Sequence, residues 1–355
     1  MHANYPQNGM ISVNRIFFQA IAAMSLVAAA QAATLSSDSP VSFVRSTSLP
    51  AVSGGFDHFA VDQKNDRLFV AAEKNKSIEM FELASGKHLA SIGGFSNPRT
   101  IAMVPELNQI LVADNDSADV KVLDVATQKI IQSIPVRPGP DAAFYDKKEK
   151  LFYVGSGGKK EKSENSSLNV ISADDHKEVA RIEIPSTNIE SMAMDRAEGK
   201  LFLNLRDKQA IGVVDLKTRK FVETWQIPGL NLNTPMAFDS KNHRLFVVGR
   251  KPGKLFVIDS TNGKLVSTVD VVDTGDDMTY DKANNRIYVT GAEGLSVLRR
   301  DDNDHFTEIE RKDTKGGKVS VYVSKLHQFY IMHPKSDADD AALDIYNVED
   351  VASSK

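Results

Sequence analysis

A short phrase of polar and apolar positions recurs along the chain. A polar turn that begins with Asp is followed by a run of apolar residues in "DSKNHRLFVVG", residues 239–249, and again in "DKANNRIYVTG", residues 281–291. Further clear copies begin at Asp62, Asp146 and Asp195, and looser copies begin at Val104 and Val323. The chain is therefore built from one repeated structural unit.

The first apolar residue after each turn gives the period of this repeat. These anchors are 41 to 50 residues apart, and they are Leu68, Ile110, Leu151, Leu201, Leu245, Ile287 and Phe329. A period of about 40 to 45 residues is typical of a four-stranded propeller blade, whereas helical-pair repeats are nearer 34 residues. The seven anchors predict an all-β fold, a seven-bladed β-propeller of four-stranded antiparallel blades.

The hydrophobic pattern also predicts the strands inside a repeat. In the fifth repeat, strands are expected at residues 234–239, 243–249, 254–259 and 264–271. They are short, rich in Val, Ile, Leu and Phe, and separated by Asp, Asn and Gly, as antiparallel sheets require. Asn262-Gly263 lies between the last two strands and favours the positive φ angles of a hairpin turn.

The two ends of the repeat array predict how the ring closes. The last repeat runs through its third strand, residues 342–348, and has no fourth strand. Residues 42–49 precede the first complete repeat and resemble the fourth strands of the others. A propeller must join its first and last blades or leave an exposed edge. We therefore expect this N-terminal strand to complete the seventh blade.

The first residues of the chain have a different pattern. Arg15 precedes an apolar run over residues 16–30, and the small residues of "AQA", 30–32, suit a signal peptidase. The run is shorter than the ~20 apolar residues that a membrane span needs. We expect a signal peptide at residues 1–32 with cleavage before Ala33, a single propeller domain over residues 33–355, and a periplasmic or secreted protein with no remaining membrane span.

Charge and cysteine content narrow the function classes. The formal net charge is −4 over 355 residues, which argues against a surface built mainly to neutralise phosphates. The chain contains no Cys. It therefore carries neither disulfides nor a covalent c-type haem.

The repeats carry a resemblance to a known family. The segments are "RLFVAA" (67–72), "RLFVVG" (244–249), "RIYVTG" (286–291) and "VIDSTNGKLVSTV" (257–269). With these repeats, the chain resembles the YVTN-repeat (YncE-like) seven-bladed β-propellers exported by bacteria, over residues 42–351. Members of such families are similar to lactonases, single-stranded DNA binders and periplasmic accessory proteins. The resemblance thus implies a fold and export, while the activity has to be argued from individual residues.

The repeats differ most where the first strand of each blade begins. The seven equivalent positions, of which six are ionisable, are Asp57, Arg99, Asp141, Glu190, Thr234, Asp276 and Lys318. The next position adds His58 and Asp277. Because the first strands surround the central channel, these side chains are expected to converge at its mouth. All of them except Thr234 are candidate ligand-binding residues.

Two interpretations of this mouth remain open. In the first, it is scaffolding, and Arg99 and Lys318 neutralise neighbouring carboxylates. In the second, clustered acids raise one another's pKa, so that the mouth binds a cation or keeps a proton. The carboxylates would suit Ca²⁺ or Mg²⁺. Alternatively, His58 and His333, with Asp57, could bind a transition metal.

Two further function classes use the same mouth. A lactonase-like hydrolase with a divalent cation would use Asp57 with His58, or Glu190 as an acid. Neighbouring residues on a strand point to opposite faces, which disfavours an Asp57–His58 pair. Ser191 lacks the surrounding G-x-S-x-G motif of a nucleophile. Binding of single-stranded DNA needs aromatic platforms, and the only Trp, Trp225, falls in an outer strand.

Loops between second and third strands provide the remaining candidates. Residues 155–167, "GSGGKKEKSENSS", are rich in Gly, Ser and Lys and predict either a mobile surface loop or a lid over the mouth. Arg206, Arg250 and Lys251 fall in neighbouring loops and could bind an anion. We therefore expect a monomeric periplasmic propeller that binds a small molecule or a protein at its channel mouth, with nucleic acid disfavoured.

Overall fold

The computed structural model describes residues 39–351. Residues 1–32, where the signal peptide is expected, lie outside the described residues, and the boundary at Ala33 stays a prediction. The compact unit that begins at Pro40 contains seven four-stranded sheets. Every strand pairing within these sheets is antiparallel. The predicted fold class is confirmed.

The first four blades each consist of four strands that are consecutive in the sequence. Blade 1 contains β2 (Phe56–Asp62), β3 (Arg67–Ala72), β4 (Ser77–Glu82) and β5 (His88–Ile92). Blade 2 contains β6 (Pro98–Val104), β7 (Gln109–Asp114), β8 (Asp119–Asp124) and β9 (Lys129–Pro135). Blade 3 contains β10 (Ala143–Asp146), β11 (Leu151–Gly157), β12 (Ser166–Ser172) and β13 (Lys177–Ile184). Blade 4 contains β14 (Ile189–Asp195), β15 (Lys200–Leu205), β16 (Ala210–Asp215) and β17 (Lys220–Gln226).

The remaining blades complete the ring. Blade 5 contains β18 (Met236–Asp239), β19 (Arg244–Arg250), β20 (Gly253–Asp259) and β21 (Leu265–Asp270). Blade 6 contains β22 (Gly275–Asp281), β23 (Arg286–Gly291), β24 (Gly294–Arg300) and β25 (Phe306–Lys312). Blade 7 contains β26 (Val319–Val323), β27 (Gln328–His333), β28 (Ala341–Val348) and β1 (Val41–Leu49). Each of the seven anchors lies in the second strand of its blade.

The described residues also include three short 3₁₀ helices: η1 (Gly158–Glu161), η2 (Arg206–Lys208) and η3 (Ser324–Leu326). None of the helices in residues 39–351 has the length and apolar character needed to cross a membrane.

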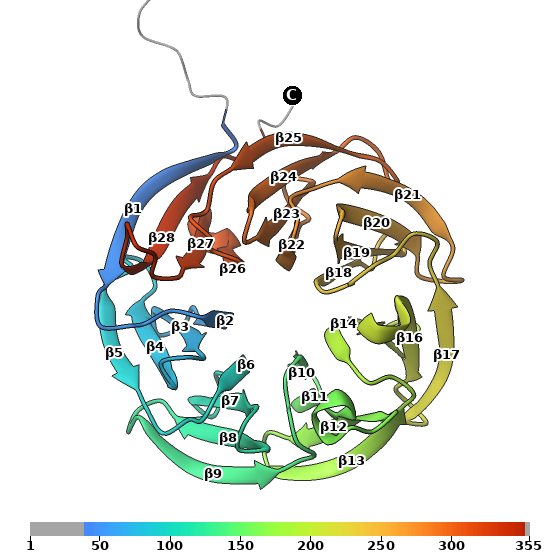
Figure 1. Ribbon diagram of the computed structural model, residues 1–355, viewed down its shortest axis with the longest axis horizontal. Helices are drawn as coiled ribbons and strands as arrows, with labels where there is room; N and C mark the ends of the chain where they lie inside the picture. Colours follow the sequence, from blue (N-terminus) through green and yellow to red (C-terminus); the bar gives the residue numbers. More distant parts are fainter. Residues whose placement is uncertain (1–38, 352–355) are drawn as a thin grey trace, which may run out of the picture. The chain divides into compact units, whose positions relative to one another are not determined.

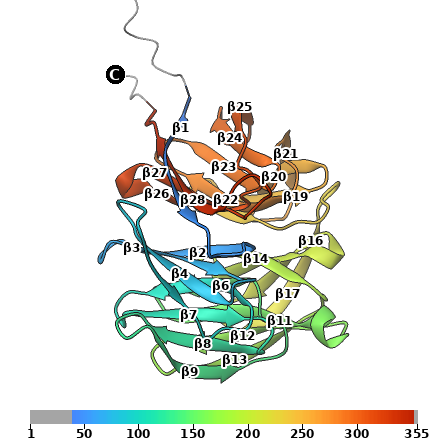
Figure 2. The ribbon, with the colours of Figure 1, turned by 60° about the vertical axis from the view of Figure 1, so that its left-hand side comes forward.

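The blades form a ring around a central channel, with the first strand of each repeat innermost (Figure 1). The ring closes through β1, which pairs antiparallel with β28 from Val41 opposite Val348 to Leu49 opposite Ala341. β1 lies beside β28 in both Figure 1 and Figure 2. The predicted closure by the N-terminal strand is confirmed, and it leaves no unpaired strand edge on β28.

The Asp that opens the repeated turn in five of the seven blades has a structural role. Asp62, Asp146, Asp195, Asp239 and Asp281 are all buried. Each accepts a hydrogen bond from a backbone N–H two or three residues later, at 2.9 to 3.2 Å. The carboxylate thus organises the turn between the first and second strands, as Asx turns do. The need for this carboxylate explains why the Asp-led turn recurs along the sequence.

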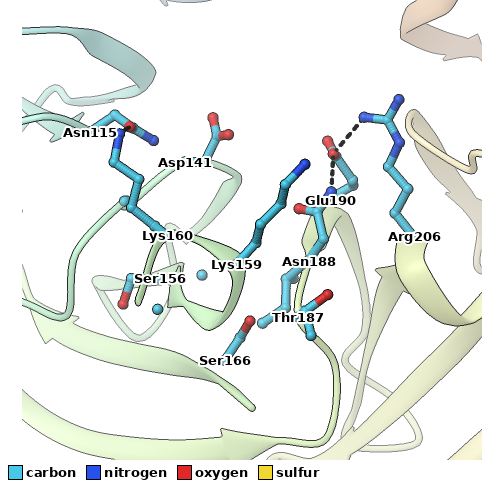
Figure 3. Close-up of a pocket in the computed structure, with 14 residues that line it drawn as sticks. Asn115, Asp141, Ser156, Lys159, Lys160, Ser166, Thr187, Asn188, Glu190 and Arg206 are labelled. Atoms are coloured by element: carbon cyan, nitrogen blue, oxygen red, sulfur yellow. Dashed lines mark hydrogen bonds and ion pairs between the residues drawn. The ribbon is translucent and has the colours of Figure 1, made fainter. Parts of the chain in front are cut away.

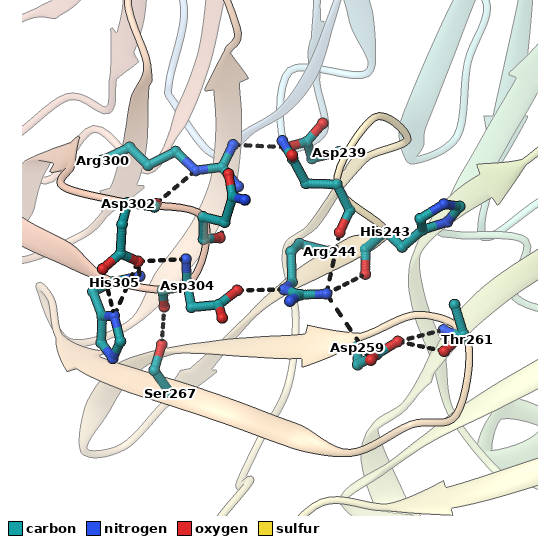
Figure 4. Close-up of polar contacts among 12 residues, drawn as sticks. Asp239, His243, Arg244, Asp259, Thr261, Ser267, Arg300, Asp302, Asp304 and His305 are labelled. Carbon is teal, nitrogen blue, oxygen red and sulfur yellow. Dashed lines mark hydrogen bonds and ion pairs between the residues drawn. The ribbon is translucent and has the colours of Figure 1, made fainter.

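Several of these turns also hold neighbouring blades together. Figure 4 shows the junction between blades 5 and 6, where the Arg300 guanidinium donates to Asp239 at 2.7 Å. Arg244 on β19 donates to Asp304 in the β24–β25 turn at 2.6 Å. The Arg300 and Asp239 side chains are almost fully buried. Each neutralises the charge of the other, which would be costly to bury alone.

Apolar side chains fill the spaces between adjacent sheets. One core cluster joins blades 1 and 2 through Phe69, Ile78, Ile101 and Ile110, and equivalent clusters lie around the ring. This interblade packing is the main source of stability in a fold without disulfides. The innermost and outermost strands are less buried, because one faces the channel and the other faces solvent.

Trp225 shows how closely two blades approach. It is buried on β17 of blade 4, where its ring lies 5.4 Å from that of Phe202. Gly263, in the β20–β21 turn of blade 5, has φ +74°, and a Cβ at this position would overlap the Trp225 ring. The predicted Asn-Gly turn therefore needs Gly for its backbone conformation and for space.

Candidate functional site

An irregularity at the start of the innermost strands directs side chains into the channel mouth. The register with the second strand shifts between Phe56 and Phe59 in blade 1, and equivalent shifts occur in blades 2, 4 and 6. A β-bulge breaks the alternation of side chains. As a result, the His58 ring reaches the Asp57 carboxylate at 3.3 Å. The expectation that strand alternation would keep these neighbours apart is wrong.

His58 lies between two carboxylates from different blades. Its Nε2 is 3.3 Å from Asp57 Oδ1, and its Nδ1 is 3.1 Å from Asp277 Oδ1. Burial opposes protonation of the ring, but Asp277 and Asp57 outweigh it and raise the pKa of His58 to about 10. Asp277 also accepts a hydrogen bond from the backbone N–H of Ser320 at 2.8 Å. His58 is therefore a cation at neutral pH.

Arg99 provides a second positive charge on the same side of the mouth. Its Nη1 is 2.7 Å from Glu73 Oε2 and 3.4 Å from Asp57 Oδ2. Burial alone would raise the pKa of Asp57, but the positive charges of His58, Lys318 and Arg99 outweigh it and lower that pKa. Glu73, which follows β3, is an acid that the sequence analysis did not identify.

Asp276 is held by two cations. Lys318 Nζ lies 2.7 Å from Asp276 Oδ2, and Arg250 Nη1 lies 3.4 Å from Asp276 Oδ1. Burial opposes the charge of Lys318, but Asp276 and Asp57 raise its pKa. Arg250, expected only as part of an anion-binding patch, thus neutralises a carboxylate of the mouth.

Glu190 is paired in the same way. Arg206 Nη1, from η2, lies 2.9 Å from Glu190 Oε1, and Asn188 Nδ2 donates to the same oxygen at 3.1 Å. The sequence analysis expected Glu190 at the mouth and Arg206 in a loop that could bind an anion, and it did not pair them. The geometry therefore agrees with the scaffold interpretation for Asp57, Asp276 and Glu190, since each has a cationic partner.

Asp141 is the exception among the carboxylates. Its backbone N–H donates to the Gly155 carbonyl at 3.1 Å. Within residues 39–351, no side chain forms a hydrogen bond or ion pair with its carboxyl group. Burial, followed by the negative charge of Asp57, raises the pKa of Asp141 to about 7, although Arg99 partly offsets this rise. Asp141 is thus an unpaired acid poised between its two protonation states at neutral pH.

Asp141 lines a cavity of about 480 Å³ between blades 2, 3 and 4 (Figure 3). Its lining is mainly polar and includes Asn115, Ser156, Lys159, Lys160, Ser166, Thr187, Asn188, Glu190 and Arg206. This volume lies within the range of small-molecule sites, which run from about 300 to 1,000 Å³. The cavity is therefore lined by two predicted mouth residues, Asp141 and Glu190, and also by residues of η1, which follows β11.

The segment at residues 155–167 is more regular than the sequence suggested. Gly155–Gly157 belongs to β11, Ser166 and Ser167 belong to β12, and η1 lies between them. The Lys159 N–H donates to the Thr187 carbonyl at 2.9 Å, and Arg137 Nε donates to Glu161 at 2.8 Å. The segment expected as a mobile surface loop or a lid thus contains a 3₁₀ helix, and its backbone is hydrogen-bonded to the connection between β13 and β14.

Of the three residues proposed as transition-metal ligands, His58 and Asp57 are in contact, but His333 does not join them. His333 is buried on β27, and its ring lies 3.9 Å from Asp344 and 3.2 Å from the Pro334 carbonyl oxygen. None of these contacts joins it to His58 or Asp57. Within residues 39–351, no group of three or more His, Cys, Asp or Glu side chains is placed to hold a metal ion.

A second cavity, of about 720 Å³, lies at the other ends of β10, β14 and β18. Its lining is largely apolar and includes Phe144, Met194 and Phe238. We call it the apolar cavity, and the one beside Asp141 the mouth cavity.

The comparisons with known proteins agree with the fold. No protein-family model matches the sequence, and no curated protein matches it significantly. A chain of the crystal structure of a mitotic checkpoint complex is similar with a TM-score of 0.71 at 11% identity, over 98% of this chain and 97% of that chain. A chain of Kuenenia stuttgartiensis hydrazine synthase is similar with a TM-score of 0.69 at 14% identity, over 84% and 96%. The chain thus shares the β-propeller fold of these proteins, and at these identities the likeness concerns the fold alone.

Proposed function

We propose that the protein is a binding protein whose mouth cavity takes a small polar ligand. The observation that carries this proposal is the unpaired Asp141 carboxyl. The other mouth acids Asp57, Asp276 and Glu190 each contact a cation, which is what a scaffold requires. A partly buried carboxyl without a partner costs stability, and a ligand that supplies the partner recovers that cost.

The other function classes receive less support from the geometry. A hydrolase with a divalent cation would need free carboxylates, whereas Asp57, Asp276 and Glu190 each contact a cationic side chain. A single-stranded DNA binder would need exposed rings for base stacking, and Trp225 is buried against Phe202 and Gly263.

We also propose that the chain is an exported propeller of the YVTN-repeat type and acts as a monomer. The repeated phrases support the family, and the pattern of residues 1–32 supports export. Fractionation of cells that express the full chain tests export. Recovery of the uncleaved chain in the cytoplasm would contradict it.

Ligand screening by thermal denaturation tests the proposed function. The panel contains amino acids and short peptides, organic acids, polyamines, sugars and nucleotides. A ligand at 100 times its dissociation constant stabilises the folded state by about 2.7 kcal/mol, which raises the melting temperature by about 4 °C for a domain of this size.

The comparison of variants locates the binding site. We expect at least one compound to stabilise the wild type, and we expect Asp141→Asn to weaken that response. Asp270→Asn is the matched control, because Asp270 lies on the outer strand β21 and its side chain is 81% exposed. A screen without any binder, or a binder to which Asp141→Asn responds like the wild type, would contradict the proposal.

A further inference from the structure

Two opposite charges without partners face the mouth cavity. Asp141 precedes β10, and Lys159 lies on η1; Figure 3 shows both side chains directed into the cavity. Within residues 39–351, neither side chain has a hydrogen-bond or ion-pair partner. The nearby Lys160 differs, because its Nζ lies 2.9 Å from Asp116 Oδ1. Arg206 and Glu190 pair with each other at 2.9 Å.

The backbones that carry these two charges are fixed. The Asp141 N–H donates to the Gly155 carbonyl, and the Gly155 N–H donates to the Ala142 carbonyl, at 3.1 and 3.0 Å. Lys159 is held through its N–H to Thr187. Gly158 has φ +55°, and a Cβ there would overlap the Thr187 carbonyl oxygen. The backbone at both positions is therefore prearranged, which reduces part of the entropy cost of binding, while the exposed Lys159 side chain still has to be ordered by the ligand.

The rest of the lining is polar and mostly uncharged. Hydroxyl and amide groups come from Asn115, Ser156, Ser166, Thr187 and Asn188. Among the described residues that line the cavity, none is aromatic. Rings for stacking on bases or on the apolar faces of sugars are therefore missing from this lining.

On the basis of the proposed function, we infer that the ligand is a small zwitterion, an amino acid or a short peptide, whose ammonium group contacts Asp141 and whose carboxylate contacts Lys159. A purely anionic ligand would leave Asp141 unpaired and would be repelled by it. A purely cationic ligand would leave Lys159 unpaired. A molecule with both charges satisfies both groups, and charge-assisted hydrogen bonds of this kind are stronger than neutral ones.

The protonation of Asp141 gives this inference a second consequence. The charged and titratable groups that act on Asp141 are Asp57, His58, Arg99 and Glu190, and the same cavity is also lined by Lys159, Lys160 and Arg206. Their combined effect, with burial, places the pKa of Asp141 at about 7. An ammonium group favours the ionised carboxylate, so binding should release a proton below pH 7 and the affinity should fall as the pH decreases.

Calorimetric titration of the full chain with matched ligands tests the inference. The probes are L-glutamine and the dipeptide glycylglutamine, each compared with its N-acetyl form, which lacks the ammonium group, and with its C-terminal amide, which lacks the carboxylate. We expect at least one unblocked probe to bind, and each of its blocked forms to bind at least tenfold more weakly. The affinity of that probe should be about tenfold lower at pH 6 than at pH 8.

Two variants assign each charge to its partner. Asp141→Asn should weaken the unblocked probe at least tenfold and remove the preference over the N-acetyl form. Lys159→Met should also weaken binding of the unblocked probe at least tenfold, and it should remove the preference over the C-terminal amide. Lys220→Met is the control, because Lys220 is exposed on the outer strand β17, and it should bind like the wild type. Circular dichroism confirms that each variant is folded.

The outcomes separate this inference from the proposed function. If the N-acetyl form or the amide binds as tightly as its parent, the zwitterion class is wrong while the mouth cavity remains a ligand site. If neither unblocked probe binds but a compound of the screen that is not a zwitterion binds in an Asp141-dependent way, the class is again wrong. If no compound binds at all, both proposals are wrong.

Discussion

Asp141→Asn should stabilise the folded protein in the absence of ligand, and the gain should increase with pH. The substitution keeps the size of the side chain and removes its charge. In the unfolded chain, an Asp has a pKa near 4, whereas the folded protein raises the pKa of Asp141 to about 7. A raised carboxyl pKa means that the folded state binds the proton more tightly, so wild-type stability falls as the pH increases from 4 to 7 and is constant above.

The magnitude follows from the same two pKa values. At about 1.4 kcal/mol for each pH unit, a pKa of about 7 in place of about 4 corresponds to about 4 kcal/mol above pH 7. Water in the open mouth cavity solvates the carboxylate and reduces this penalty. We expect a gain of about 2 kcal/mol at pH 8, or about 3 °C in melting temperature for a domain of some 310 residues.

Urea unfolding at pH 5, 6, 7 and 8 measures this effect. The fluorescence of Trp225, which is buried and is the only Trp in the chain, reports the loss of the fold. The difference between Asp141→Asn and wild type should grow with pH and level off near pH 8. Glu190→Gln makes the same change in charge but leaves Arg206 without its partner, so it should lower stability by about 1 kcal/mol at pH 7. A gain for Asp141→Asn that does not depend on pH, or a loss at pH 8, would refute the reasoning.

Three further predictions test the scaffold. Deletion of residues 42–49 should remove β1, expose the edge of β28 and cause aggregation or loss of cooperative melting, and a deletion variant that melts like the parent would contradict the closure. Gly263→Ala should lower the melting temperature by several degrees, because the new Cβ strains the positive φ angle and overlaps the Trp225 ring. Gly199→Ala is the control and should have a smaller effect, because Gly199 also has a positive φ but no atom lies within 4 Å of the added Cβ. The raised pKa of His58 stabilises the fold fully below about pH 6.5 and progressively less as the pH rises towards 10, so His58→Gln should lose stability at pH 7 and approach the wild type near pH 10; a constant deficit would show that the charge of His58 is not responsible.

The fold could be predicted well from the sequence because the repeated residues form a local structure, the turn between the first and second strands of a blade. Asp62, Asp146 and three equivalent Asp residues organise five of the seven first turns, so they recur at the blade period and mark it. Closure could also be predicted, because counting strands leaves the last blade one short. Both inferences depend on the order of strands and do not require side-chain geometry.

The candidate site was predicted only in part. The positions at the channel mouth follow from the strand count, and the structure places them there. The pairings do not follow, because Glu73 follows β3, Arg206 begins η2 and Arg250 ends β19, and the partners that their side chains reach depend on tertiary packing. The bulges that bring His58 to Asp57 also depend on packing between strands. The unpaired state of Asp141 depends on which carboxylates the neighbouring cations contact, and the sequence does not determine those contacts.

A crystal structure of the complex with the tightest compound from the ligand screen tests the central claim most directly. The account predicts density for the compound in the mouth cavity, in contact with the Asp141 carboxyl. Density in the apolar cavity beside Phe144 and Met194, or on the outer face of the blades, with the mouth cavity unchanged, would contradict it.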